Sequence, residues 1–269
     1  DQALLMLMLE AGQTSPSRYL RYVEDFIHKF PKSVEGYVSK AEFYLAQNDF
    51  GKANATMQTA LSMADKKDEA HYNLAKLIYQ KEIKQANMPY PQWNLDLALA
   101  ETNKAYALNP LPLYKHLEAQ IVYFKGEYAK AYEQFMALTK TNLRNGELFY
   151  EAAQCKQQLK APFAEILTLL DSAVTAQDAN LSAPYVLARG TALHGAQQYK
   201  KAMVDYNRYD SLMLGRASHD FYYTRALCEV QLRQFQQALN DFAHAIVLNR
   251  AEPTYYAELA QLQLRVNQK

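Results

Sequence analysis

Apolar residues recur along the chain with the period of an α-helix. Between Phe235 and Ile246 they follow an i, i+3, i+4, i+7 spacing, which places them on one helical face. An aromatic residue, an alanine three positions later and a bulky apolar residue four further on form a pattern that occurs four times, at Phe50–Met57, Tyr128–Phe135, Tyr199–Tyr206 and Phe235–Phe242. Since no segment alternates for long with the period of a β-strand, the pattern predicts an all-α protein.

Small residues mark a longer period, of about 34–37 residues at most steps. They stand at Ala41, Ala75, Ala119, Ala153, Gly190, Ala226 and Ala260. In four cases a second alanine follows twelve residues later, at Ala53, Ala131, Ala202 and Ala238. The spacing predicts pairs of helices whose axes approach closely at the small residues, with the large residue four positions on filling the space beside each seam.

Prolines and a candidate N-cap mark the expected helix starts, independently of the apolar period. Pro16, Pro162, Pro184 and Pro253 stand where helices are expected to begin, because proline suits the first helical turn. Asp68 is a candidate N-cap for the helix that follows it.

These features together resemble the tetratricopeptide repeat, a helix–turn–helix of 34 residues. "YVSKAEFY" followed by "ANATM" fits its pattern, with Tyr37 at the tryptophan position and Ala41 at the glycine position, and "YTRALCEVQLRQFQQALNDFAHAIVLN", which ends at Asn249, is another good match. Tryptophan is absent from its usual position in every unit, and Ile166 replaces an expected alanine. The resemblance implies a single right-handed superhelical solenoid over 1–269. Its expected repeats are 1–33, 34–67, 68–111 with a long inter-helix loop at 80–94, 112–145, 146–182, 183–218, 219–252, and a terminal helix at 253–269.

In such a solenoid the first helix of each repeat lines the concave inner surface, and this too is what the resemblance implies. Four positions on each first helix face that surface, and they form a tyrosine-rich, mildly acidic set. The candidate groove residues are Glu35, Val38, Glu42, Glu69, Tyr72, Lys76, Tyr79, His116, Gln120, Tyr123, Glu147, Tyr150, Gln154, Thr191, His194, Asp220 and Tyr223. Tyrosine offers a large contact area at little entropic cost, so this surface suits an extended peptide.

The charge of this face indicates what it would bind. Family members that clamp acidic C-termini carry Lys or Arg at one of these positions, where this chain has Val38, Tyr72, His116, Tyr150, Leu187 and Tyr223. A carboxylate clamp is therefore not expected. The excess of acidic over basic groove residues favours a neutral or basic peptide or protein partner.

Two other segments are candidates for binding. The loop "MPYPQW" carries Tyr90 and the only tryptophan, Trp93, and long loops in regular arrays are often functional; packing of Trp93 under the next helix is the alternative. The N-terminal "ALLMLML" is apolar all round, which predicts a missing upstream repeat or contact with a partner.

Composition excludes several classes of function. With 29 Lys+Arg, 28 Asp+Glu and no basic stripe, the sequence lacks the clustered positive charge typical of nucleic-acid-binding proteins. Its longest apolar run is too short to span a bilayer. Ser218, His219 and Asp220 have catalytic residue types, but adjacent residues cannot converge on one point, so Ser218 is interpreted as an N-cap. The histidines lack metal-ligand spacing, and Cys155 and Cys228 are expected to be buried small hydrophobes. We therefore expect neither an enzyme nor a cofactor or metal site.

The sequence predicts a protein-interaction scaffold. Two alternatives stay open at this level: carbohydrate binding by a tyrosine-lined groove in a cell-envelope protein, and a purely structural spacer. The missing start methionine and the sparse cysteines favour a periplasmic or bacterial cell-envelope location over the cytoplasm.

Overall fold

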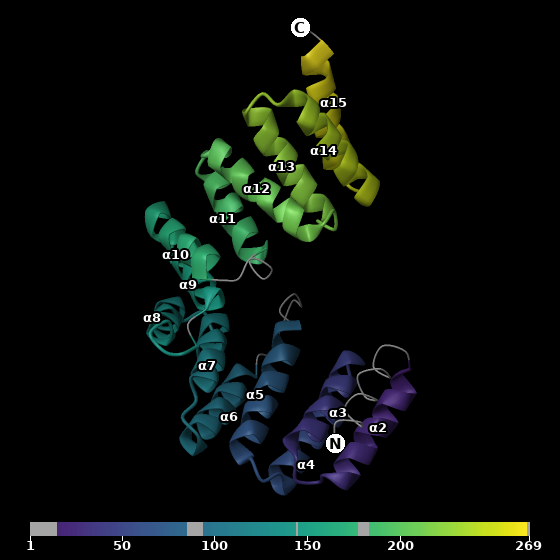
Figure 1. Ribbon diagram of the computed structural model, residues 1–269, viewed down its shortest axis with the longest axis vertical. Helices are drawn as coiled ribbons and strands as arrows, with labels where there is room; N and C mark the ends of the chain where they lie inside the picture. Colours follow the sequence, from purple (N-terminus) through teal and green to yellow (C-terminus); the bar gives the residue numbers. More distant parts are fainter. Residues whose placement is uncertain (1–14, 85–93, 144, 177–182, 268–269) are drawn as a thin grey trace. The chain divides into compact units, whose positions relative to one another are not determined.

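The computed structural model describes residues 15–84, 94–143, 145–176 and 183–267. Its regular structure over these residues is helical throughout (Figure 1), which confirms the predicted all-α class. The chain divides into two compact units, the first ending at Leu143 and the second beginning at Arg144. The predicted continuation of all repeats into one solenoid remains a prediction.

In the described part of the first unit there are three helical hairpins preceded by one helix. Its helices are α2 (Pro16–Lys29), α3 (Val34–Ala46), α4 (Phe50–Met63), α5 (Lys67–Lys84), α6 (Leu95–Leu108), α7 (Pro112–Phe124) and α8 (Tyr128–Leu138). The hairpins are α3 with α4, α5 with α6 and α7 with α8, and α2 packs on α3. A continuous apolar core runs through α3 to α7 and includes the buried side chains of Met57, Ile78 and Ile121.

The second unit repeats this arrangement. Its helices are α9 (Gly146–Gln158), α10 (Phe163–Ala176), α11 (Ala183–Gly195), α12 (Tyr199–Met213), α13 (His219–Gln231), α14 (Phe235–Leu248) and α15 (Pro253–Asn267). Three hairpins, α9 with α10, α11 with α12 and α13 with α14, are followed by α15, which packs on α14. Pro253 begins α15, as the sequence predicts, while α10 and α11 begin within one residue of their prolines.

The small residues lie where helices approach most closely. Ala53, Ala131, Ala202 and Ala238 are all fully buried at 0% exposure. A Cβ added to Gly190 would lie 3.1 Å from the Tyr206 ring and from the Asp205 Cβ, so α11 and α12 approach more closely than most side chains allow. The periodic small residues are therefore a requirement of helix packing.

The turn between the two helices of a hairpin has a recurring geometry. Five turns place one residue in the left-handed region, with φ between 54° and 82°: Asn48, Gly126, Lys160, Gln197 and Arg233. After each such residue the next amide N–H donates back to a carbonyl five positions earlier, as from Gln198 to Leu193 at 2.9 Å. This is the Schellman arrangement that ends many helices, and it favours glycine at the left-handed position. Only the turn at Gly126 has glycine at this position, so the other four turns adopt the left-handed conformation at a cost in free energy.

Ion pairs centred on two buried aspartates, Asp205 and Asp241, link helices within the second unit. On α11, the Arg189 guanidinium donates to both carboxylate oxygens of Asp205 on α12, with Nε–Oδ2 and Nη2–Oδ1 distances of 2.8 and 2.7 Å. Its Nη1 donates to Asp171 on α10 at 2.8 Å. One arginine thus joins three helices.

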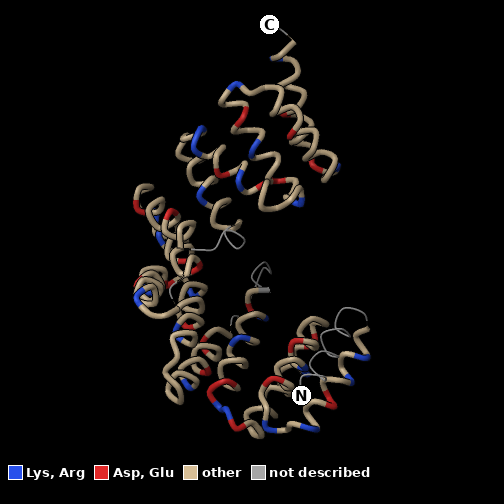
Figure 2. Tube along the Cα trace, viewed as in Figure 1, with Lys and Arg blue, Asp and Glu red and all other residues tan. Residues whose placement is uncertain are grey.

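The same arrangement recurs one repeat later. Arg225 on α13 donates to both oxygens of Asp241 on α14 at 2.5 and 2.9 Å, and to Asp210 on α12 at 2.7 Å. Figure 2 shows acidic and basic residues interspersed along the helices of both units. The sequence analysis did not anticipate that some of these charges form a repeated network around a buried aspartate.

Two local predictions need correction and two are confirmed. Helix α5 continues to Lys84, through the first part of the stretch expected to be a loop, because residues 80–84 contain only helix-compatible side chains. Asp68 lies inside the first turn of α5 and is not its N-cap. Ser218 does cap α13, with its hydroxyl oxygen accepting from the Phe221 amide, and both cysteines are free and buried.

Candidate functional site

The candidate groove residues lie on the first helices of the hairpins. In the first unit these helices are α3, α5 and α7, and in the second they are α9, α11 and α13. The two loop candidates, Tyr90 and Trp93, and the apolar stretch at the N-terminus lie outside the described residues.

Among the described residues of the first unit, the most concentrated group of aromatic side chains lies in the C-terminal halves of α5 and α7. The Tyr79 ring centroid lies 5.5 Å from that of Phe124, and the Tyr123 centroid lies 5.5 Å from Phe124 and 5.2 Å from Tyr128 on α8. All three contacts are edge-to-face, the favoured geometry of aromatic pairs. Phe124 is 37% exposed, and the three tyrosines are half-buried. These four residues are called the aromatic cluster below.

A second tyrosine pair lies nearer the start of the same helices. Tyr72 lies 5.0 Å from Tyr114, whose hydroxyl donates to Asp68 at 2.9 Å. Burial and this carboxylate raise the pKa of Tyr114. Burial acts to raise the pKa of Asp68, but hydrogen bonds from Asn109 and Tyr114 outweigh it and lower that pKa. The Tyr72 ring therefore packs against a tyrosine whose own position is fixed by a hydrogen bond.

The acidic candidates of α3 and α5 are partly neutralised by lysines. The carboxylate of Glu42 lies 3.6 Å from the Lys76 ammonium, an ion pair that links α3 to α5. The carboxylate of Glu69 lies 2.7 Å from the ammonium group of Lys66. Glu35 stays exposed at the start of α3. Less net negative charge therefore remains on this face than the sequence alone suggests.

Two of the other predicted residues take part in packing between helices. His116 is only 7% exposed, its ring lies 6.0 Å from that of Phe135, and its Nε2 lies 3.4 Å from Gln120 Nε2. Val38 is half-buried against the apolar core. Both contribute mainly to packing.

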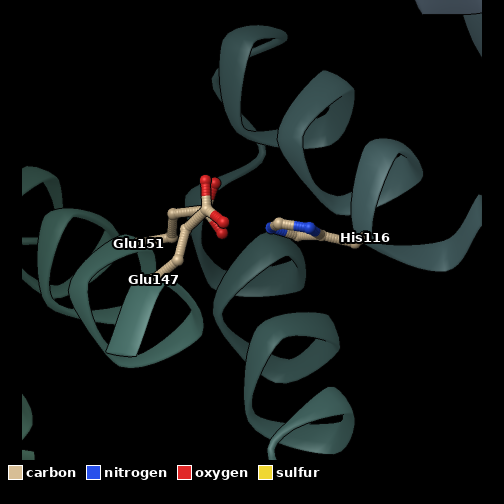
Figure 3. Close-up of side chains that lie close together, drawn as sticks. All are labelled: His116, Glu147 and Glu151. Carbon is tan, nitrogen blue, oxygen red and sulfur yellow. The ribbon is translucent and has the colours of Figure 1, made fainter. Parts of the chain in front are cut away.

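In the second unit an acidic and aromatic group lies on α9 and α11. Glu147 and Glu151 are one turn apart and project from the same face of α9 (Figure 3; the third side chain drawn, His116, belongs to the first unit). Tyr150 lies 5.2 Å from Tyr185 on α11 and accepts a hydrogen bond from Gln154 at 3.2 Å. Burial, followed by the charges of Glu147 and Glu151, raises the pKa of Tyr185 to about 12. The Tyr185 hydroxyl therefore lies in a negative field.

The remaining candidates lie on α11 and α13. His194 Nδ1 lies 3.1 Å from the Tyr206 hydroxyl, and burial lowers the pKa of this histidine. Asp220 accepts from the Tyr255 hydroxyl at 2.7 Å, and the Tyr223 ring lies 4.8 Å from that of Tyr255. Thr191 is exposed.

The structure brings the tyrosines into local groups that the sequence positions did not specify. Sequence reasoning missed Phe124, Tyr128 and Tyr185, which complete the two groups; Tyr128 lies on the second helix of its hairpin, which was not considered. Phe124 and Tyr185 each lie one position away from the four positions counted as inward-facing, so counting only those four positions excluded them. The arrangement offers aromatic surface, hydroxyl groups and carboxylates, which can bind a polypeptide by contact and charge.

Comparisons with known proteins give no sequence relative. No protein-family model matches the chain, and none of the curated proteins matches it. Among the described residues, no helix combines the length and apolar character needed to cross a membrane.

Solved structures do resemble it. A chain of the APC/C hetero-tetramer Cut9–Hcn1 is similar with a TM-score of 0.66 and 13% identity, over 92% of this chain and 48% of that one, so this chain spans about half of its length. A tetratricopeptide repeat protein from Parabacteroides merdae has a TM-score of 0.58 and 13% identity, covering 97% and 98% of the two chains. YrrB, described as a tetratricopeptide repeat protein with an unusual peptide-binding site, has a TM-score of 0.52 and 18% identity over 79% and 98%. Together with the repeated hairpins, these likenesses confirm the predicted architecture: the chain has the fold of tetratricopeptide-repeat proteins.

Proposed function

We propose that this protein is a non-catalytic interaction scaffold that binds an extended segment of a partner protein along the first helices of its hairpins. The observation that carries the proposal is the aromatic cluster, Tyr79, Tyr123, Phe124 and Tyr128. Its side chains come from three helices, are partly exposed, and are ordered by contacts with one another. Aromatic residues that are held rigidly and remain accessible are typical of the residues that dominate binding energy in protein interfaces.

The charges support a neutral or basic partner. In the second unit, Glu147, Glu151 and Asp220 place carboxylates on the first helices, while the acidic residues of the first unit are partly offset by Lys66 and Lys76. Carboxylates beside the Tyr150–Tyr185 pair favour lysine or arginine in a segment bound there, and they disfavour acidic segments. We therefore expect basic residues in the part of the partner that contacts the second unit.

The structural likenesses agree with this function. YrrB is described as having a peptide-binding site, and Cut9–Hcn1 is an assembly of protein chains. At 18% and 13% identity they establish the fold, so the peptide-binding role is a proposal for this chain.

The test compares three forms of the full chain in a pull-down from lysate of the source cell. The first is the unchanged protein, the second is Tyr79→Ala/Tyr123→Ala, and the third is Tyr106→Ala, a half-buried tyrosine on the second helix of a hairpin. Thermal unfolding followed by circular dichroism confirms that all three are folded. We expect at least one protein to be lost from the double variant and kept by the Tyr106 variant.

Titration of the captured protein's peptides then measures the loss directly. Removing two anchoring tyrosines should weaken binding by about tenfold or more. Equal recovery by all three folded forms would contradict the proposal and favour a structural spacer. Retention of soluble glycans, lost only in the double variant, would replace it with carbohydrate binding.

A further inference from the structure

The turns of two neighbouring hairpins lie side by side in the second unit. Near the end of α13, the Cys228 thiol donates a weak hydrogen bond to the backbone carbonyl of Tyr199 at the start of α12, with an Sγ–O distance of 3.5 Å. A hollow of about 420 Å³ lies between the α11–α12 turn and the end of α13, and it is lined by Gln197, Gln198, Tyr199, Lys200, Lys201 and Leu232. We call residues 197–201 and 232–234 the turn edge.

The turn edge carries positive charge that its own segments do not offset. Its exposed cations form no ion pair with any other described residue, and they are Lys200, Lys201 and Arg233. The sequence has no Asp or Glu in 195–204 or in 230–240. The acidic residues that border these stretches, Asp205, Glu229 and Asp241, are 2%, 5% and 8% exposed. An approaching ligand therefore meets cations and no accessible carboxylate from these two stretches.

The corresponding turns of the first unit carry carboxylates. Asp49 follows the left-handed residue of the α3–α4 turn and pairs with Lys52 at 2.9 Å. Glu127 follows the left-handed residue of the α7–α8 turn and pairs with Lys130 at 3.2 Å. Lysines beside those two turns are thus neutralised within the chain, whereas the cations of the turn edge are not.

The residues of the turn edge are not the ones that stabilise such turns best. Gln198 and Gln234 are the N-cap residues of α12 and α14, and neither side chain accepts a capping hydrogen bond, whereas the Asp49 carboxylate caps α4. Gln197 and Arg233 precede them in the left-handed conformation that favours glycine. Positions that depart from local rules of stability are commonly functional.

We propose that the turn edge binds an acidic segment of a partner protein. Carboxylates of the segment would lie beside the three cations, and one apolar side chain would enter the hollow next to the half-buried Tyr199 and Leu232. Charge complementarity identifies the occupant. The glutamine amides of the edge can donate further hydrogen bonds to carboxylates.

This surface is separate from the one proposed above. The turn edge contains no residue of the aromatic cluster or of the Tyr150–Tyr185 pair, where a basic segment is expected. The two proposals therefore stand or fall independently.

A polypeptide fits the turn edge better than a nucleic acid or a lipid surface does. Nucleic acids require a basic stripe, and anionic membranes are typically recognised by clusters of about four to eight Lys or Arg. The turn edge has three cations around a hollow with a mainly apolar lining. An acidic segment can supply both the carboxylates and the apolar side chain.

The test measures binding of a dye-labelled synthetic peptide, Glu-Glu-Glu-Phe-Glu-Glu-Glu, to the full chain by fluorescence anisotropy at low ionic strength. Lys200→Gln/Arg233→Gln removes two charges from the turn edge. The matched control, Arg216→Gln/Arg250→Gln, removes two charges from exposed positions just beyond the other ends of α12 and α14. Circular dichroism confirms that both variants are folded. A second peptide has alanine in place of phenylalanine, and a third has glutamine in place of every glutamate.

We expect the acidic peptide to bind the unchanged protein and the control equally, and to bind Lys200→Gln/Arg233→Gln about tenfold more weakly. The alanine peptide should bind the unchanged protein more weakly than the phenylalanine peptide, and the glutamine peptide should not bind. Equal affinity for the two variants, or no binding of the acidic peptide to the unchanged protein, would overturn the proposal. Equal affinity for the phenylalanine and alanine peptides would overturn the role of the hollow.

Two further measurements test other occupants. One is cosedimentation with vesicles of phosphatidylserine and phosphatidylcholine, and the other is sedimentation of the protein alone. Vesicle binding without peptide binding, lost in Lys200→Gln/Arg233→Gln and kept in the control, would assign the edge to a membrane surface. A dimer that only Lys200→Gln/Arg233→Gln abolishes would assign it to a second copy of the chain. Either result would overturn the proposal.

Discussion

Glu229 gives the most specific prediction about stability. This residue lies on α13, is 5% exposed, and its Oε2 has no hydrogen-bond partner among the described residues. Burial, followed by the negative charge of Asp241, raises its pKa from 4.5 to about 7, although Arg225 acts in the opposite direction. Arg225 cannot neutralise Glu229 effectively because its guanidinium is already bonded to Asp241 and Asp210.

The raised pKa has a defined consequence for stability. The folded state holds the Glu229 proton more tightly than the unfolded state, so the contribution of this group is most favourable below pH 4.5. It is lost as pH rises from 4.5 to about 7, and it is constant above that. At 1.36 kcal/mol per unit, the shift corresponds to about 3 kcal/mol of unfolding free energy. Glu229→Gln removes the titration and should remove this pH dependence.

The assay is urea unfolding of the full chain, followed by circular dichroism, at intervals between about pH 4.5 and pH 8. The difference in unfolding free energy between the unchanged protein and Glu229→Gln should change by about 3 kcal/mol across this range. Glu133→Gln, at an exposed position on α8, is the control and should run parallel to the unchanged protein. If the unfolding free energies of Glu229→Gln and the unchanged protein differ by the same amount at every pH, the reasoning is refuted. The size of that constant difference, which the buried amide would cause, does not matter.

Three further predictions concern packing, charge and turn geometry. Asp241→Ala leaves the 13%-exposed side chain of Arg225 without its two-oxygen partner, so we expect a loss of about 3–5 kcal/mol in urea unfolding, and a much smaller loss when Arg225→Leu is combined with it. Gln197→Gly should stabilise the chain by about 1 kcal/mol because Gln197 has a φ of 59°, whereas Gly126→Ala, at a φ of 82°, should lower the melting temperature. Phe242→Ala, at a fully buried position, should cost about 3–5 kcal/mol; a loss below about 1 kcal/mol would show that the α13–α14 seam is not close-packed.

Much of the fold follows from local features of the sequence. Helix positions are set by a 3.6-residue period and by prolines, as at Pro16 and Pro253, and these signals act within a few residues of one another. The end of α5 is the informative error: residues 80–84 form helix although the repeat length predicts a loop. Repeat length is an average property of a family, whereas helix extension depends on the residues present.

The candidate site is less predictable because it joins distant residues. Tyr79 and Phe124 are far apart in the sequence, and only the packing of α5 against α7 brings their rings within 5.5 Å. The lysines that offset Glu42 and Glu69 were visible in the sequence, but the pairing of Lys76 with Glu42 depends on two helices lying side by side. The net charge of a surface is therefore a tertiary property even when its residues are known.

By itself, the sequence determined that this protein is helical, that its helices pair into hairpins, and that small residues occupy the seams. These are consequences of short-range periodicity and of side-chain volume. The tertiary structure decided which charges pair across helices, as for Arg189 with Asp205 and Arg225 with Asp241, and why the pKa of Glu229 is raised. It also decided that Ala260 on α15 is exposed while Ala226 on α13, 34 positions earlier, is buried. The two alanines occupy the same position of the repeat, and they differ in whether another helix packs against them.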